Sequence, residues 1–174
     1  MQSFTKMDLT EHGREKNDND AAEQDFSCMR EALLLAQAAA ADGEVPVGCV
    51  VTYGASIIGR GKNETISRKD PTAHAEILAL RAAAQKLGNH RLSGCVVYST
   101  LEPCAMCAGA LIHARVAALV YATPDPKAGA AGSVLSVVDH PALNHRVELR
   151  SGVLAQESAE LLQGFFRERR KAVR

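Results

Sequence analysis

Two short segments of the chain carry residue types that together could hold a metal ion. One is His-Ala-Glu at positions 74–76, and the other is Pro-Cys-Ala-Met-Cys at positions 103–107. One helical turn separates Cys104 from Cys107, so a helix would place both thiols on the same side. An imidazole and two thiolates are ligands that zinc prefers. The pattern therefore predicts that His74, Cys104 and Cys107 hold one zinc ion per chain.

Three protein ligands leave one position of a tetrahedral zinc ion open, as in catalytic rather than structural sites. A water molecule bound there has a pKa of about 7. Glu76 lies two residues from His74, which is an awkward spacing for joint ligation of one ion. It suits a group that moves protons between the water and a leaving amine. The sequence thus predicts a hydrolytic enzyme with Glu76 as its catalytic acid and base.

Other interpretations of the two cysteines remain. A structural zinc site would need a fourth ligand, and the histidines at positions 90, 113, 140 and 145 lack zinc-finger spacing to the cysteines. A thioredoxin-type redox pair would have no need of His74 or Glu76. The joint pattern of His-x-Glu and Pro-Cys-x-x-Cys is the signature of zinc-dependent nucleobase deaminases, whose nucleophile attacks C4 of cytosine or C6 of adenine.

Helices and strands are expected to alternate around these segments. Apolar residues at helical spacing predict helices over residues 23–43, 73–87, 104–114 and 155–171. Runs of β-branched residues predict a hairpin over 47–58 and single strands over 95–101, 117–122 and 147–149. This order predicts an α/β domain in which helices cover both faces of a central sheet of five strands. Both metal-binding segments would then begin a helix.

The two ends of the chain differ in charge, although its 20 basic and 20 acidic residues cancel overall. Residues 1–25 hold three basic and seven acidic residues, for a net charge of −4, and residues 165–174 have a net charge of +4. A basic helix can bind nucleic-acid phosphates, although basic residues also suit the carboxyl end of any helix.

The N-terminal segment gives no sign of a membrane anchor or an export signal. Residues 1–22 are polar, mixed in charge and without apolar periodicity, which predicts a disordered tail before a single domain at 23–174. No apolar run approaches the roughly 20 residues that span a bilayer. We therefore expect no membrane association and a cytoplasmic location.

From about residue 25 to residue 171 the chain resembles the bacterial tRNA-specific adenosine deaminases. The zinc segments, within 70–77, 100–104 and 106–110, are shared by the whole deaminase superfamily. Three further segments point to the tRNA branch: Lys-Ala-Gly-Ala-Ala-Gly-Ser at 127–133, Asn-His-Arg-Val-Glu at 144–148 and Phe-Phe-Arg-Glu-Arg-Arg at 165–170. The segment Glu-Val-Pro-Val-Gly at 44–48 also belongs to the resemblance.

The resemblance implies a cytidine deaminase-like fold, with three α/β/α layers around a central mixed five-stranded sheet. It implies a homodimer that converts adenosine to inosine at the wobble position of a tRNA anticodon stem-loop. Glu76 would pass a proton from water to N1 of adenine and later protonate the departing ammonia. Asn63 would hydrogen-bond the flipped nucleotide, since an amide both donates and accepts. The alternative for Asn63 is a turn residue that ends the hairpin.

The resemblance also implies RNA contacts. Asp125 would accept from a ribose 2′-hydroxyl and Lys127 would meet a phosphate, unless these residues only form a solvated turn. Phe166 would stack on a base, and Arg169 and Arg170 would meet phosphates. Phe165 is expected in the core.

Two competing functions use the same residues. One is a deaminase of free guanine, cytosine or a cytidine nucleotide, which would have no use for a basic, aromatic C-terminal helix. The other is a non-catalytic, zinc-stabilised RNA-binding module, which would give no reason for the carboxylate of Glu76 beside a zinc ligand.

Overall fold

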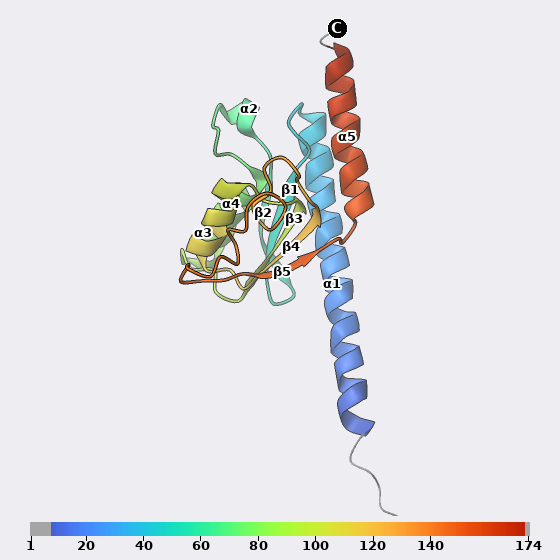
Figure 1. The fold of residues 1–174 in the computed structure, drawn as a ribbon, viewed down its shortest axis with the longest axis vertical. Helices are drawn as coiled ribbons and strands as arrows, with labels where there is room; N and C mark the ends of the chain where they lie inside the picture. Colours follow the sequence, from blue (N-terminus) through green and yellow to red (C-terminus); the bar gives the residue numbers. More distant parts are fainter. Residues whose placement is uncertain (1–7, 173–174) are drawn as a thin grey trace, which may run out of the picture.

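The structure is a computed structural model that describes the backbone of residues 8–172 and the side chains of residues 20–171 (Figure 1). One mixed sheet has the strand order β2-β1-β3-β4-β5. The strands are β1 (Gly48–Tyr53), β2 (Ser56–Lys62), β3 (Cys95–Leu101), β4 (Ala118–Thr123) and β5 (Glu148–Ser151). Strand β1 runs antiparallel to β2 and β3, whereas β3, β4 and β5 are parallel. The expected fold class is confirmed.

Helices cover both faces of the sheet, as Figure 1 shows. One face carries α3 (Ala75–Leu87) and α4 (Ala105–Ala114), and the other carries α1 (Asp8–Ala41) and α5 (Ala155–Ala172). Strand β1 is buried on both sides: Cys49 and Val51 belong to the core beneath α3 and α4, and Val50 packs toward α1. Its near-continuous apolar run follows from this central position.

The N-terminal part of α1 differs from the sequence prediction. Helix α1 begins at Asp8 rather than near residue 23, and its first half projects away from the sheet (Figure 1). Residues 8–22 are therefore helical instead of a disordered tail, and residues 1–7 lie outside the described residues. Missing apolar periodicity indicates only that no surface packs against a segment, whereas Ala, Glu, Lys and Arg favour helix by themselves. The extent of the domain, 23–174, stays a prediction.

Close packing of α3 on the sheet depends on two glycines in β2. A Cβ atom on Gly59 would lie 2.3 Å from the carbonyl oxygen of Ala79, and one on Gly61 would lie 2.2 Å from that of Ala75. Only glycine permits so close an approach. It brings the first turn of α3 against the sheet. Among the described residues, no helix combines the length and the hydropathy that a membrane span requires.

Candidate active site

The three expected zinc ligands lie together where α3 and α4 begin. His74 is the N-cap residue of α3 and Cys104 that of α4, both with extended backbone, and Cys107 lies in the first turn of α4. Nδ1 of His74 lies 3.7 Å from Sγ of Cys104 and 3.6 Å from Sγ of Cys107. A tetrahedral zinc ion with ordinary bond lengths would hold a nitrogen and a sulfur ligand about 3.5 Å apart. The donor set therefore fits zinc in type and in spacing.

The pKa values of these three side chains also favour the binding of a cation. The pKa of the Cys104 thiol is lowered to about 3, first by the hydrogen bond from Cys107 and then by that from His74. The hydrogen bond with Cys104 raises the pKa of His74 in turn. A hydrogen bond with Cys104 and burial raise the pKa of Cys107. One thiolate is thus present already, and binding of a metal ion would release the proton of the other thiol.

The carboxylate of Glu76 lies beside the donor set and is almost fully buried, with 3% of its surface exposed. Its Oε1 accepts a hydrogen bond of 3.1 Å from the Ser99 hydroxyl, and Oε2 accepts one of 3.5 Å from Sγ of Cys107. Burial is the main cause that raises its pKa above the ordinary value. A buried carboxyl group whose pKa is raised in this way can both accept and return a proton.

A cavity of about 220 Å³ opens onto His74, Glu76 and Cys104. Asn63 and Asp125, which were expected to contact substrate, also line it. The structure thus brings two of the expected substrate contacts together with the candidate metal site and Glu76. The cavity is of a size for one nucleobase, and its lining combines polar side chains with a few apolar ones.

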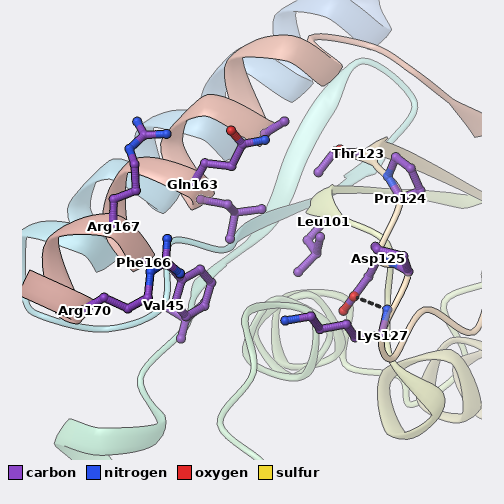
Figure 2. A pocket seen from close by; sticks show the side chains of 13 residues that line it. Val45, Leu101, Thr123, Pro124, Asp125, Lys127, Gln163, Phe166, Arg167 and Arg170 are labelled. Carbon is purple, nitrogen blue, oxygen red and sulfur yellow. Dashed lines mark hydrogen bonds between the residues drawn. The ribbon is translucent and has the colours of Figure 1, made fainter.

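A larger groove of about 620 Å³ adjoins this cavity and shares Asp125, Val45 and Leu101 with it. Figure 2 shows the loop after β4 on one side of the groove and α5 on the other. Lys127, Phe166 and Arg170, which are expected to contact RNA, line it, and Phe166 is 44% exposed. Sequence reasoning missed Arg167 and Gln163, although positions 163, 166, 167 and 170 share one helical face.

Arg169, which is expected to meet a phosphate, is not among the residues that line this groove. Its guanidinium donates to the carbonyl oxygen of Gly43 and lies 5.0 Å from the centre of the Phe165 ring. Phe165 is half-buried as its ring packs edge-on against Phe166 at 5.5 Å between centroids. Position 169 falls on the face of α5 that turns toward the end of α1, so helical geometry separates it from Arg170.

Sequence reasoning also missed the carboxylate that holds the loop after β4. Glu102 is 1% exposed and accepts hydrogen bonds from the backbone N–H groups of Asp125 (3.0 Å), Ala131 (2.9 Å) and Ser133 (3.0 Å). The Ser133 hydroxyl donates to it as well. Glu102 lies two residues before Cys104. The same short segment therefore carries a candidate metal ligand and the carboxylate that holds the rim of the groove. The signal in the sequence is a carboxylate at the end of an apolar strand, because a charge buried there needs hydrogen-bond partners.

Comparison with known proteins agrees with this geometry. Residues 23–170 match the MafB19-like deaminase family. The sheet with its two layers of helices and the His-Cys-Cys donor set beside Glu76 therefore define a deaminase.

The more similar relatives act on tRNA. The chain is 49% identical over 151 residues to the tRNA-specific adenosine deaminase of Haemophilus influenzae, which covers 86% of this chain and 87% of that protein. A solved structure described for A-to-I editing by tRNA:A34 deaminases at the wobble position is 42% identical, with a TM-score of 0.76 over 78% of this chain and 99% of that one. A guanine deaminase from Nitrosomonas europaea is 27% identical, with a TM-score of 0.68 over 80% and 83% of the two chains. The chain belongs to the tRNA-specific adenosine deaminase family.

Proposed function

We propose that this protein hydrolyses adenosine to inosine at the wobble position of a tRNA anticodon and that one zinc ion per chain serves the reaction. The observation that carries the proposal is a single cavity, bordered by a His-Cys-Cys donor set, a buried carboxylate and an amide, that joins a basic and aromatic groove. The tRNA-specific relatives support the choice of substrate.

His74, Cys104 and Cys107 would hold the ion, which when bound supplies an acidified water as the nucleophile for C6 of adenine. Glu76 accepts a proton from this water and donates it to N1 of the base. The other proton of the water passes through the same carboxylate to the departing amino group. Adenosine and water thus give inosine and ammonia. The burial that raises the pKa of Glu76 suits it to both transfers.

The groove beside the cavity suits the rest of the anticodon loop. Lys127, Arg167 and Arg170 offer positive charge to phosphates, and the exposed ring of Phe166 offers a surface for a neighbouring base. One oxygen of Asp125 accepts the backbone N–H of Lys127 at 2.9 Å, which leaves the other for a ribose hydroxyl.

We also propose that the protein works as a homodimer in the cytoplasm, where tRNA is found. The exposed apolar side chains of Met106, Val134 and Leu135 supply surface that a second copy would bury. The mass in solution, measured by sedimentation, tests this part separately.

Free guanine is the second candidate substrate, favoured by the similarity to a guanine deaminase and by a cavity that would hold a free purine.

The test is incubation of the purified protein with an anticodon stem-loop carrying adenosine at the wobble position, with inosine measured by mass spectrometry. The same loop as DNA, guanine and cytidine serve as controls. Inosine in the RNA loop alone supports the proposal. Ammonia from guanine or cytidine without inosine overturns it, and loop binding without any product indicates a non-catalytic module.

A further inference from the structure

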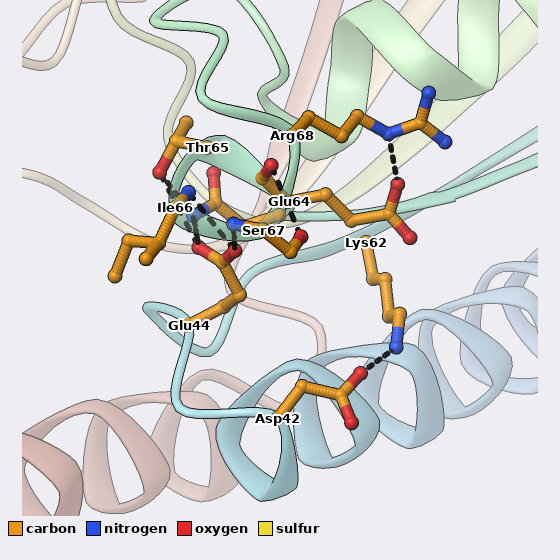
Figure 3. Close-up of polar contacts among 9 residues, drawn as sticks. Asp42, Glu44, Lys62, Glu64, Thr65, Ile66, Ser67 and Arg68 are labelled. Atoms are coloured by element: carbon orange, nitrogen blue, oxygen red, sulfur yellow. Dashed lines mark hydrogen bonds and ion pairs between the residues drawn. The ribbon is translucent and has the colours of Figure 1, made fainter.

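The carboxylate of Glu44 lies outside the chemistry described above, yet it is 1% exposed and surrounded by donors (Figure 3). It lies between α1 and β1 and faces the start of the short helix α2 (Thr65–Arg68). Its Oε1 accepts from the backbone N–H groups of Ile66 (3.0 Å) and Ser67 (2.8 Å). Its Oε2 accepts from the Thr65 hydroxyl (3.3 Å) and from Nδ2 of Asn63 (3.2 Å). Glu44 therefore ties α2 to the one amide that lines the substrate cavity.

Glu44 is held as an anion. Burial, the largest influence, raises its pKa, but hydrogen bonds from the backbone N–H groups of Ser67 and Ile66 outweigh it, and the pKa lies below the ordinary value. An ionised carboxylate only accepts hydrogen bonds. The amide of Asn63 must therefore turn its nitrogen toward Glu44.

The other end of the Asn63 amide is left for the cavity. Nδ2 also lies 3.3 Å from Oγ1 of Thr65, so both of its protons have acceptors within the protein. Among the described residues no donor lies within hydrogen-bond distance of Oδ1. Because none of their fully buried side-chain N or O atoms lacks a partner, Oδ1 is not fully buried. Oδ1 is thus open to the cavity that Asn63 lines with His74 and Glu76.

We propose that Glu44 is a positioning residue that fixes the polarity of Asn63, so that the amide offers the flipped nucleotide an acceptor and not a donor. The proposal rests on the proposed function, in which Asn63 contacts the nucleotide. An acceptor at this point selects a hydroxyl or an amino donor of the substrate. The ring nitrogens N3 and N7 of adenine, which only accept, are not recognised there.

A reciprocal exchange of the two side chains tests this polarity. Glu44→Gln keeps an oxygen for Ile66 and Ser67 but places an amide nitrogen against Nδ2 of Asn63, so the Asn63 amide turns over. Asn63→Asp places two carboxylates face to face. In the double variant the glutamine donates to the aspartate, whose second oxygen again offers an acceptor to the cavity.

We expect each single variant to lower kcat/KM for the stem-loop by about 10- to 100-fold, as for an unpaired buried polar group. The double variant should recover to within about tenfold of the wild type.

Glu64→Gln is the matched control, because Glu64 lies beside α2 and pairs only with Arg68 at the surface. Its kinetics should equal those of the wild type. Zinc content and melting temperature are measured for every variant, since a purely structural role would lower the melting temperature without reciprocal rescue.

Three outcomes overturn the proposal: wild-type kinetics in Glu44→Gln, a double variant no better than the worse single variant although it is folded and loaded with zinc, or single variants impaired only through loss of fold. If the double variant does not fold, the kinetics of Glu44→Gln decide alone. Absence of inosine with the wild type contradicts the proposed function instead, and the same cycle is then measured on guanine.

Discussion

Oε1 of Glu76 accepts a hydrogen bond from the Ser99 hydroxyl at 3.1 Å, across the interface between α3 and β3. Both residues are buried, so this donor stabilises the charged form of a carboxylate that burial disfavours. Strand β3 thereby supplies a hydrogen-bond donor to the carboxylate of Glu76.

Replacement of Ser99 by alanine should raise the pKa of Glu76 further and move the rising, low-pH limb of the rate profile to higher pH. We expect kcat at neutral pH to fall about tenfold, which corresponds to about 1.4 kcal/mol. The pH dependence of inosine formation measures this. Ser56→Ala is the control, since Ser56 is an exposed residue at the start of the edge strand β2. An unshifted profile would mean that Ser99 does not tune Glu76.

Glu102→Gln should destabilise the loop after β4 in a pH-dependent way. Hydrogen bonds from Ser133, Asp125 and Ala131 lower the pKa of Glu102 below its ordinary 4.5, although burial, the largest influence, raises it. Stability from a depressed pKa is present above the unfolded pKa and is lost as pH falls through the folded pKa. We expect a deficit of about 1–3 kcal/mol at pH 7 that shrinks below pH of about 4.

Denaturant unfolding of Glu102→Gln at neutral and acid pH measures this deficit. Glu160→Gln, an exposed exchange on α5, serves as the control. A deficit of equal size at both pH values would show that the charge of Glu102 contributes nothing.

The two adjacent arginines of α5 should differ in their effect on RNA binding. Arg170 lines the groove, whereas Arg169 is engaged with Gly43 and Phe165. Arg170→Ala should reduce the slope of log affinity against log salt by about 0.7, the value for one lost phosphate contact on a single strand. Arg169→Ala should leave the slope unchanged. Anisotropy titrations of a labelled stem-loop at several salt concentrations measure both, and equal slopes for the two variants would contradict this assignment.

Loss of a metal ligand should remove zinc and activity together. Cys104→Ser replaces the thiol whose pKa is lowest, and we expect at least a tenfold loss of metal affinity. Acidification should also release zinc from the wild type, because protons compete for His74, whose pKa is raised by its bond to Cys104. A colorimetric zinc assay at pH 8 and pH 6 measures this. Full activity in protein shown to be free of metal would contradict a catalytic role for zinc.

The parts of the site that could be predicted are those set by local spacing. His74, Glu76, Cys104 and Cys107 lie at helix starts, and runs of β-branched residues predicted the five strands along the chain. The remainder depends on long-range contacts: Glu44 and Glu102 acquire their roles from amides more than twenty residues away along the chain. Arg169 and Arg170 are the same residue type at adjacent positions, and only the packing of α5 beside α1 gives them different surroundings. The sequence of residues 8–22 lacks apolar periodicity, so periodicity could not reveal that they are helical.

The most direct test compares inosine formation in the anticodon stem-loop by the wild type and by Glu76→Gln, each with its zinc content determined. We expect one zinc ion per chain in both proteins, inosine from the wild type, and a rate lowered by about 10²- to 10⁴-fold in the variant. A variant that keeps its zinc and forms inosine at the wild-type rate would contradict the assignment of Glu76 as the group that moves the protons.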